Sequence, residues 1–535
     1  MNIDHNILTI ITFTPLAGAI VLALLPDRDK VQQWAALAVT LLTFLFTLHL
    51  PFRYDYTVPA GTFQFQQNLS WITSPAIRYH VGVDGLSMWL IVLTGLLAPL
   101  GVLISWRAID NRRKLFYTLF LLQQVAMLGI FVSLDLFLYY AFWELSLVPM
   151  ALLIAVFGRT ENRRRAAIKF FLYAFIPSAI LLVGMLWLYA RTGTFDYPQL
   201  AQMAAAHSIS SNQTALWLAS LAFLVAFAVK VPIFPLHGWL SDAVSEAPTA
   251  AVMVIAGKLG LYSILRFSLG IFPGQSHLIA PLMLALGAIG IVYGALLALV
   301  QKDLKRLAAF ATLGHVSVVL LGIFACTISG IDGGIYQTLN EGIGGAALFM
   351  LLGLLYERYR NYDMREYGGL AARLPWMVTL FVLTTLSVVG LPMLNGFVGE
   401  FLIFSGTMQS TIAHHTGWTV LATSSVILTA SYMLWMIQRV FYGDLSNRAA
   451  KIEPQDLTAR EHLALWPLVA LFLFMGIASP VWLRAIDAAG SRIAATVNRS
   501  QAVTVNFEAS SRNGIKSPET ALNLSKASST TKGAQ

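Results

Sequence analysis

The feature that most constrains the fold of this chain is a succession of long apolar segments. Each spans about 20 residues, the length that an α-helix needs to cross the hydrocarbon core of a bilayer. Only 11% of the 535 residues are charged, against about 25% in an average soluble domain. The sequence therefore predicts an all-α membrane protein with about 14 transmembrane helices. The expected spans, in chain order, are residues 5–25, 32–51, 85–105, 114–133, 135–157, 167–190, 214–238, 248–270, 278–300, 306–328, 333–356, 376–407, 416–440 and 463–483.

Lysine and arginine concentrate in alternate connecting loops. They crowd the loops WRAIDNRRK (106–114) and GRTENRRRAAIK (158–169), whereas TGTFDYPQ (192–199), on the opposite side, has none. Short loops rich in these residues remain in the cytoplasm, so both chain termini are expected on the outer side. The net charge of +9 then reflects membrane orientation. No basic run interleaved with aromatic residues predicts nucleic-acid binding.

One loop departs from this pattern. SDAVSEAPTA (241–250) is cytoplasmic by alternation, yet it carries acids and no lysine or arginine. Two interpretations remain open: a proton uptake region, or a turn that caps a helix through Ser245 or Thr249.

Lys230 lies inside an apolar run and is followed closely by Pro232 and Pro235. A lysine at the centre of a bilayer costs roughly 2.5 to 3.5 kcal/mol on insertion scales. Proline interrupts the hydrogen bonds of a helix, and membrane transporters build ion sites where helices are broken. A lysine that extends to the membrane interface is the alternative, but a long apolar run precedes this one. We therefore expect Lys230 to be functional.

Other ionisable residues also fall at membrane depth, and each must face the bundle interior, pair or become neutral. Glu144 has the charge to pair with Lys230. Opening such a pair favours release of the lysine proton, so Glu144 and Lys230 together are predicted to act as a proton gate. His315 titrates near neutral pH and is expected to relay protons. The remaining residues of the set are Lys258, Glu341 as a possible relay near a span end, and Glu400 as an outward carrier.

Structural roles are the alternatives for these residues: Glu144 as the partner of an arginine, and His315 as a packing histidine. Arg266, Lys305, Arg306 and Arg439 are expected to anchor span ends on the cytoplasmic side.

A faint internal repeat organises the spans. The seventh has Lys230 beside Pro232, and the twelfth has Pro392, Gly396 and Glu400. An offset of five helices places two units in opposite orientations, an arrangement common in transporters. We thus predict two inverted five-helix repeats with broken helices 7 and 12. The expected divisions are residues 1–113 (spans 1–3), 114–275 and 276–445 (the repeats), 446–483 (span 14) and 484–535 (a flexible extramembrane tail rich in Ser, Thr and Lys).

Motifs for cofactors are not found in the sequence. Cys326 is the only cysteine, His315 has no second helical histidine for haem, and there is no Gly-rich nucleotide loop. His237 and Asp242 lack the spacing of a metal motif, although His237 is a possible relay residue. We expect no cofactor or metal in this chain, so the energy for any transport arrives from a partner.

Several segments resemble the proton-translocating, antiporter-like subunits of respiratory complex I and their relatives in Mrp antiporters and membrane-bound hydrogenases. The resemblance covers roughly residues 1–480. It is carried by KVPIFPLHGWLSDAVSEAPT (230–249), HVGVDGLSMWLIVLTGLLAPL (80–100), YYAFWELSLVPM (139–150) and LPMLNGFVGEFLIF (391–404). Glu400 marks one branch of the family, since the sibling subunits L and N and the Mrp subunits usually have lysine at that position.

The resemblance implies a fourteen-helix fold in which Glu144 and Lys230 are the ion pair that gates proton uptake. It also implies that His315 lies on a central hydrophilic axis and that Glu400 is the exit-side carrier. The implied function is proton pumping in a complex I-type NADH–quinone oxidoreductase of the bacterial inner membrane. NADH, FMN, iron–sulfur clusters and quinone would be bound by partner subunits, and the L-type and N-type subunits would be neighbours. An Mrp-type antiporter and a hydrogenase subunit are the alternatives.

Three positions depart from the family pattern. The usual PDAH is Ser241, Asp242, Ala243 and Val244 here, and Glu341 stands where the family often has histidine. The segment 249–266 is about three residues shorter than usual, nearly one helical turn, so Lys258 can still point inward.

Overall fold

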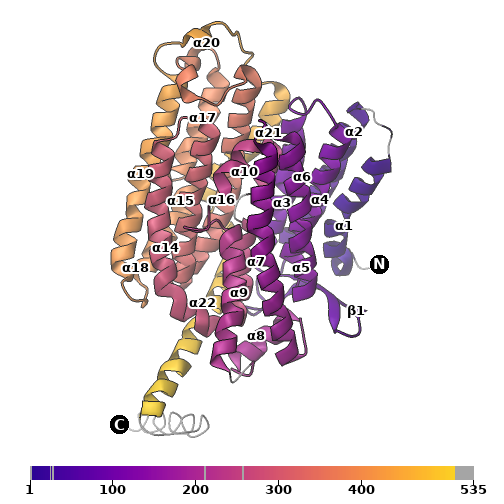
Figure 1. Ribbon diagram of the computed structural model, residues 1–535, viewed down its shortest axis with the longest axis vertical. Coiled ribbons are helices and arrows are strands. Elements are labelled where there is room, and N and C mark those ends of the chain that lie inside the picture. Colours follow the sequence, from indigo (N-terminus) through magenta and orange to yellow (C-terminus); the bar gives the residue numbers. More distant parts are fainter. Residues whose placement is uncertain (1–2, 25, 27–28, 210–211, 256–257, 513–535) are drawn as a thin grey trace.

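The computed structural model describes residues 3–24, 26, 29–209, 212–255 and 258–512. Long helices run side by side along the longest axis of the molecule, and α8 and the strand β1 lie at the lower end (Figure 1). The helices up to the first break are α1 (Ile3–Leu24), α2 (Asp29–Arg53), α3 (Met88–Ser105), α4 (Arg113–Val132), α5 (Leu136–Leu145), α6 (Leu147–Phe157), α7 (Arg163–Thr192), α8 (Tyr197–Ala205) and α9 (Gln213–Lys230).

The second part of the chain is helical as well, with one π-helix and two short 3₁₀ turns. Its elements are α10 (Leu240–Glu246), α11 (Thr249–Ile255), α12 (Lys258–Ser263), the π-helix η1 (Ile264–Ser268), α13 (Leu269–Ile271), α14 (Pro273–Leu299), α15 (Leu304–Phe324), α16 (Ile328–Tyr359), η2 (Met364–Glu366), η3 (Leu370–Ala372), α17 (Pro375–Val388), α18 (Asn395–Met408), α19 (His415–Phe441), α20 (Asn447–Ala450), α21 (Ala459–Ile477) and α22 (Pro480–Arg512).

Thirteen segments of the described chain are helical, long and apolar enough to cross a membrane. They match the predicted spans except the twelfth, 376–407, which is divided into α17 and α18 by the non-helical residues 389–394. The prediction of an all-α membrane protein of about 14 spans is confirmed, and the breaks fall in the seventh and twelfth spans, as expected.

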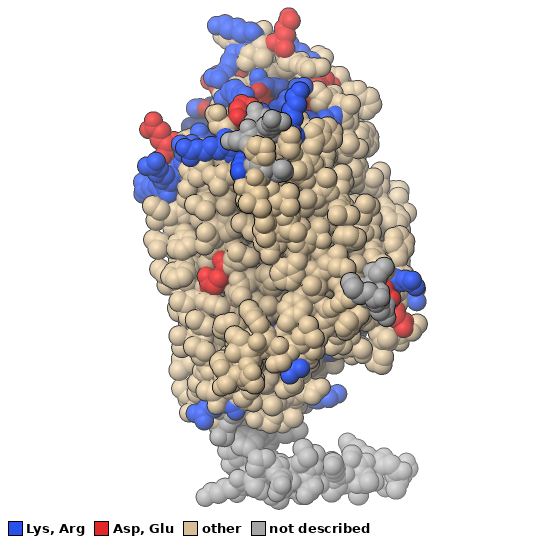
Figure 2. All heavy atoms as spheres, turned by 90° about the vertical axis from the view of Figure 1, so that its right-hand side faces the viewer, with Lys and Arg blue, Asp and Glu red and all other residues tan. Residues whose placement is uncertain are grey.

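The charges lie mainly at the ends of the bundle. Figure 2 shows lysine and arginine gathered at the upper end of one face, above a broad belt of other residues. Apolar side chains such as Val183 and Ile427 are exposed on the long helices, at 68% and 72%. An exposed apolar belt between charged ends is the surface that a bilayer covers.

The same short β-bridge occurs twice, five spans apart. At the start of α5, Leu136 N donates to Phe195 O at 2.9 Å and Tyr197 N to Leu134 O at 2.7 Å. At the start of α15, Leu304 N donates to Tyr362 O and Met364 N to Lys302 O, both at 2.9 Å. An aspartate caps each helix, Asp135 or Asp303. This correspondence supports the inverted repeat, which stays a prediction.

A two-stranded hairpin, which the sequence reasoning missed, covers part of the lower end (Figure 1). Strands β1 (Gln64–Ile72) and β2 (Ile77–Val83) pair antiparallel, with Asn68 opposite His80. The chain then turns into α3 at Asp84, whose carboxylate accepts hydrogen bonds from both terminal nitrogens of Arg266 at 2.6 Å. Arg492 of α22 adds a third contact at 3.3 Å.

Arg266 was expected to anchor a span end on the cytoplasmic side, and this prediction is wrong. Its side chain is fully buried in η1 and pairs with Asp84 next to the hairpin. An isolated arginine gives no sequence signal of its partner, because Asp84 lies 182 positions away.

The prediction of a flexible tail at 484–535 is also wrong in its first part. Residues up to Arg512 continue as α22, and Ala485, Ile486 and Val497 are buried against the bundle. Apolar residues three and four apart form a helical stripe that the high content of Ser, Thr and Asn concealed. Residues 513–535 lie outside the described part of the chain.

We predict that Arg266→Met destabilises the protein by about 3 kcal/mol or more, because it leaves a buried carboxylate with Arg492, at 3.3 Å, as its remaining cationic partner. Unfolding by SDS titration measures the loss. The double variant Asp84→Asn/Arg266→Met should recover much of it, and Asp363→Asn, at an exposed pair with Arg365, should change little. Equal stability of Arg266→Met and the wild type would contradict this role.

The same pair determines a pH dependence. Burial raises the pKa of Asp84, but the neighbouring Arg266 and Arg492 outweigh it and lower the pKa to about 2. A carboxyl whose pKa falls on folding stabilises the native state above its unfolded pKa, and this contribution is lost as the pH falls toward 2. Asp84 therefore adds no pH dependence between pH 5 and 8.

Candidate functional site

The seventh span breaks directly after Lys230. Helix α9 ends at this residue, and residues 231–239 are not α-helical before α10 begins. Pro232 and Pro235 carry no backbone N–H, so the regular helical ladder cannot continue through them. Ile233 N donates instead to Ala228 O at 2.9 Å. The break leaves Lys230 at a helix end inside the bundle.

Lys230 points toward the junction of α5 and α6. Its Nζ donates to Ser146 Oγ at 3.3 Å, and the ammonium lies 5.2 Å from the ring centre of Trp143 and 5.7 Å from that of Phe170. Two aromatic faces and a hydroxyl stabilise a cation that is removed from water. Lys230 is half-buried and does not extend to a membrane end.

Glu144 and Lys230 are not in direct contact. Among the ion pairs of the described residues within 4 Å, none joins these two, although Glu144 interacts electrostatically with Lys230. Glu144 accepts a hydrogen bond from Ser178 of α7. The expected ion pair is therefore a separated arrangement, with Ser146 on the lysine side and Ser178 on the glutamate side.

Lys258 is the next buried cation. It begins α12, and its side chain is almost completely buried. Nζ donates to Met253 O at 3.1 Å and interacts electrostatically with Glu341. Gly342 lies against it, since a Cβ there would be 3.4 Å from Nζ. Lys258 thus points inward, as the comparison of helix lengths predicted.

Glu341 is at the centre of the buried cluster. Its Oε1 lies 2.9 Å from Nδ1 of His315, and the side chain is only 14% exposed. His315 Nε2 contacts the hydroxyl of Tyr432 of α19 at 3.2 Å. Glu341 also interacts electrostatically with Lys258 and Glu400. The residue expected near a span end therefore lies mid-helix and connects the others.

Glu400 lies on α18, just past the break of the twelfth span. It is 7% exposed and interacts with the charges of His315 and Glu341. A cavity of about 10 Å³ lies between Glu400, His315 and Tyr432, which is close to the room that one water molecule needs. Gly390 lies against the carboxylate of Glu400, because a Cβ at position 390 would be 2.8 Å from Glu400 Oε2.

A neutral polar network adjoins this cluster, and the sequence reasoning missed it. Asn340 donates to the Oε1 of Gln337 and to the backbone oxygen of Asn395, both at 2.8 Å. Asn395 donates to Asn340 Oδ1 at 3.0 Å and accepts from Ser387 at 2.6 Å. Neutral amides such as those in TLNEG and MLNGF carry no charge that would mark them as costly in a span, so the sequence gives little signal of this network.

The acidic segment 241–250 was expected to be a loop, but most of it belongs to α10 and the start of α11, and it has partners at the upper end. Asp242 lies 2.7 Å from Lys169 and 3.5 Å from Arg306, and Glu246 accepts from Thr160 at 2.8 Å. His237 stacks on Phe234 and is half-buried. The segment is therefore joined to basic loops, and its acids are ion-paired or hydrogen-bonded.

Lys305 was expected to anchor a span end at the membrane interface, and this prediction is wrong. It is buried and donates to Ala247 O. In the described residues, no three His, Cys, Asp or Glu side chains gather as metal ligands would.

Known proteins match this chain over most of its length. The family described as NADH:quinone oxidoreductase/Mrp antiporter, transmembrane, matches residues 133–438. NADH-quinone oxidoreductase subunit M of Rhodobacter capsulatus is 40% identical over 491 residues, which cover 88% of this chain and 93% of that protein. NADH-ubiquinone oxidoreductase chain 4 of Arabidopsis thaliana is 35% identical over 473 residues, 88% and 93% of the two chains.

Solved structures share the fold. A chain of respiratory complex I from Thermus thermophilus with bound NADH has a TM-score of 0.81 at 29% identity, covering 92% of this chain and 99% of that one. A chain of the Mrp complex from Dietzia sp. DQ12-45-1b has a TM-score of 0.81 at 21% identity, covering 94% and 99%. The second likeness is one of fold.

A bundle with two broken spans and a buried row of titratable groups is the architecture of an antiporter-like membrane subunit. The chain belongs to the NADH:quinone oxidoreductase/Mrp antiporter family. Its relatives over most of the length include subunits M, which confirms the branch that Glu400 predicted. The chain is thus a multi-pass, proton-translocating subunit of a membrane complex of the NADH–quinone oxidoreductase type.

We predict that Gly390→Ala displaces Glu400. Gly390 has a φ of +80°, where an L side chain is strained, and its added Cβ would collide with the carboxylate. Proton translocation should fall by about tenfold for a displacement that costs roughly 1.4 kcal/mol, measured in sealed vesicles. Gly443→Ala is the matched control, because Gly443 has a φ of +83° and its Cβ would meet nothing within 4 Å. Unchanged translocation in Gly390→Ala would contradict the positioning of Glu400.

Proposed function

We propose that this subunit carries protons along the row Lys230, Lys258, Glu341, His315 and Glu400. Redox chemistry takes place in partner subunits that bind NADH, FMN, iron–sulfur clusters and quinone, and the L-type and N-type subunits adjoin this one. Glu144 modulates the row at its first member. The observation that carries the proposal is the position of Glu341: its Oε1 lies 2.9 Å from His315 Nδ1, and the adjacent Gly342 lies against Lys258. His315 in turn lines the same small cavity as Glu400.

The helices that carry Lys230 and Lys258 pack against each other. Gly260, two residues after Lys258, lies against the end of α9, since a Cβ there would be 2.9 Å from Phe227 O and from Val231 N. Lys230 is the last residue of α9. A shift of the broken helix would move both cations together, which supports proton release from one lysine when the other changes partner.

The polar groups around Glu400 supply the outer half of this route. Each ring nitrogen of His315 has a hydrogen-bonding partner: Nδ1 faces the carboxylate of Glu341, and Nε2 faces the hydroxyl of Tyr432. One water in the small cavity would bridge His315 and Glu400. Hydrogen-bonded side chains and water let a proton move without a bare charge crossing hydrocarbon.

We predict that Glu144→Gln or Lys230→Ala leaves the protein inserted and the complex assembled but strongly reduces coupled pumping. The glutamine keeps a hydrogen-bond acceptor for Ser178 and removes the charge. Pumping is measured as NADH-driven acidification in sealed vesicles, against quinone reduction in the same vesicles. Wild-type proton flux in both variants would reject the role of these residues.

The subunits that co-purify with this chain distinguish a complex I-type assembly from a hydrogenase and an Mrp-type antiporter. Purification from membranes in mild detergent should recover NADH-oxidising subunits with this chain. Recovery of hydrogenase subunits, or sodium-dependent proton flux without a redox partner, would instead indicate a hydrogenase or an Mrp-type antiporter.

We infer that the upper end of the bundle faces the cytoplasm of a bacterial cell and that both termini lie on the periplasmic side, because lysine and arginine favour cytoplasmic loops. In a Cys326→Ala background, a cysteine at Arg165 should react with a membrane-impermeant maleimide only in inside-out vesicles. A cysteine at Asn68 of the hairpin should react only in right-side-out vesicles. The reverse labelling would invert the topology.

A further inference from the structure

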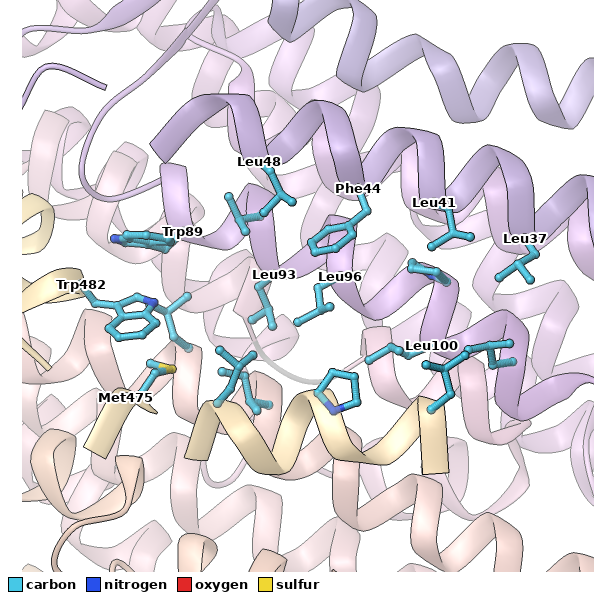
Figure 3. A pocket seen from close by; sticks show the side chains of 18 residues that line it. Leu37, Leu41, Phe44, Leu48, Trp89, Leu93, Leu96, Leu100, Met475 and Trp482 are labelled. Atoms are coloured by element: carbon cyan, nitrogen blue, oxygen red, sulfur yellow. The ribbon is translucent and has the colours of Figure 1, made fainter. Parts of the chain in front are cut away.

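An apolar groove runs along the bundle between α2, α3, α16 and α21 (Figure 3). Its volume is about 540 Å³, and its walls consist only of apolar and aromatic residues, such as Leu41, Phe44, Leu96 and Leu471. All four helices are long and apolar enough to cross a membrane. The groove is therefore at membrane depth, where water does not fill it.

The groove is elongated along the helix axes. Trp89, Trp482 and Met475 form one end, and along α2 the lining extends from Leu48 to Leu37 (Figure 3). Those two leucines are about three helical turns apart, or about 16 Å. Half of the hydrocarbon core of a bilayer is about 15 Å. The groove thus has the length of one lipid tail in one leaflet.

The rim of the groove faces outward. Leu41 of α2 is 43% exposed and Leu463 of α21 is 63% exposed, and both belong to the lining. Apolar side chains that are exposed at this depth contact lipid in a membrane protein. An acyl chain can therefore enter from the side without any movement of the helices.

Basic residues lie just beyond the upper end on three of the four walls. Lys30 and Arg107, from the start of α2 and the end of α3, are exposed, and Arg460 is at the start of α21. Gln33 holds two of the walls together by donating to Trp106 O at 2.8 Å. The three cations therefore lie beyond the upper end of the groove, at the ends of α2, α3 and α21.

Two of the nearby carboxylates pair with other arginines. Asp110 pairs with Arg113 at 3.6 Å, and Glu461 pairs with Arg358 at 2.7 Å. Arg460 is only 18% exposed and contacts Glu461 through Nη2 at 3.3 Å, and its buried Nη1 has no hydrogen-bond partner in the described residues. Lys30 and Arg107 therefore remain as exposed cations above the groove, which complement an anionic group.

We propose that this groove binds one anionic phospholipid, with an acyl chain between α2, α3, α16 and α21 and the phosphate among Lys30, Arg107 and Arg460. The charge at one end and the apolar length below it match the two parts of such a lipid.

The lipid packs against the helix that carries the central glutamate. Leu339 and Ile343 of α16 line the groove, and Glu341 lies between them in the sequence and faces His315. The acyl chain therefore closes the outer side of the α3–α16 seam, where Gly342 contacts Leu93. It keeps water away from the rear of the buried cluster.

The test uses the assembled complex in nanodiscs of mixed phosphatidylglycerol and phosphatidylcholine, followed by a detergent wash and native mass spectrometry of retained lipid. Two variants separate the parts of the site: Leu96→Trp fills the groove, and Lys30→Gln/Arg107→Gln/Arg460→Gln removes the charge. Leu186→Trp on the exposed face of α7 and Arg164→Gln/Arg165→Gln/Lys451→Gln at other exposed positions are the controls. If Leu96→Trp fails to assemble, Leu41→Trp at the rim replaces it.

The wild type and both controls should retain phosphatidylglycerol in preference to phosphatidylcholine. Leu96→Trp should lose one bound lipid of either kind. Each basic residue near an anionic lipid strengthens binding about fivefold. The preference of the triple variant for phosphatidylglycerol over phosphatidylcholine should therefore fall about tenfold or more. Equal retention by Leu96→Trp and the wild type would overturn the proposal, as would cross-linking of Leu41→Cys to a neighbouring subunit instead of lipid.

Discussion

The unfavourable free energy of an unpaired charge at membrane depth is the constraint on which this structure depends. Three ionisable groups in the spans have partners of different kinds: Ser146 and aromatic faces for Lys230, a backbone oxygen for Lys258, and Glu341 for His315. These partners lie where the helices are interrupted or packed closely. Function and fold therefore share the same requirement, that charged groups inside the bundle be stabilised by neighbouring polar or aromatic groups.

Broken helices supply partners for the buried groups and also allow those partners to change. The breaks after Lys230 and before Asn395 place functional groups beside backbone that has left the helical ladder. A short displacement there changes which partner a side chain contacts, whereas a continuous helix transmits only rigid motion. The separated arrangement of Glu144 and Lys230, each held by its own serine, fits such a device, because neither group must break a direct ion pair before it moves.

Two parts of the molecule stabilise the lower end without taking part in this row. The buried Asp84–Arg266 pair joins the hairpin to η1, and Arg492 extends the contact to α22. The sequence reasoning assigned Arg266 to the wrong end and α22 to a flexible tail. Both errors have one cause: a residue's charge and a segment's composition do not reveal a partner more than a hundred positions away, and that partner decides whether burial is tolerated.

Hydrophobic length and the distribution of lysine and arginine determined the spans, and proline determined the break after Lys230, because the cost of exposing backbone or charge to hydrocarbon acts locally along the chain. The identity of Glu400 was enough to indicate the branch of the family. Only the tertiary structure decided that Glu341 is central, that Glu144 contacts Ser178 instead of Lys230, and that Asn340 and Asn395 form a network. Those outcomes depend on the rotation and packing of helices, in which differences of a few ångströms select among partners of equal chemistry.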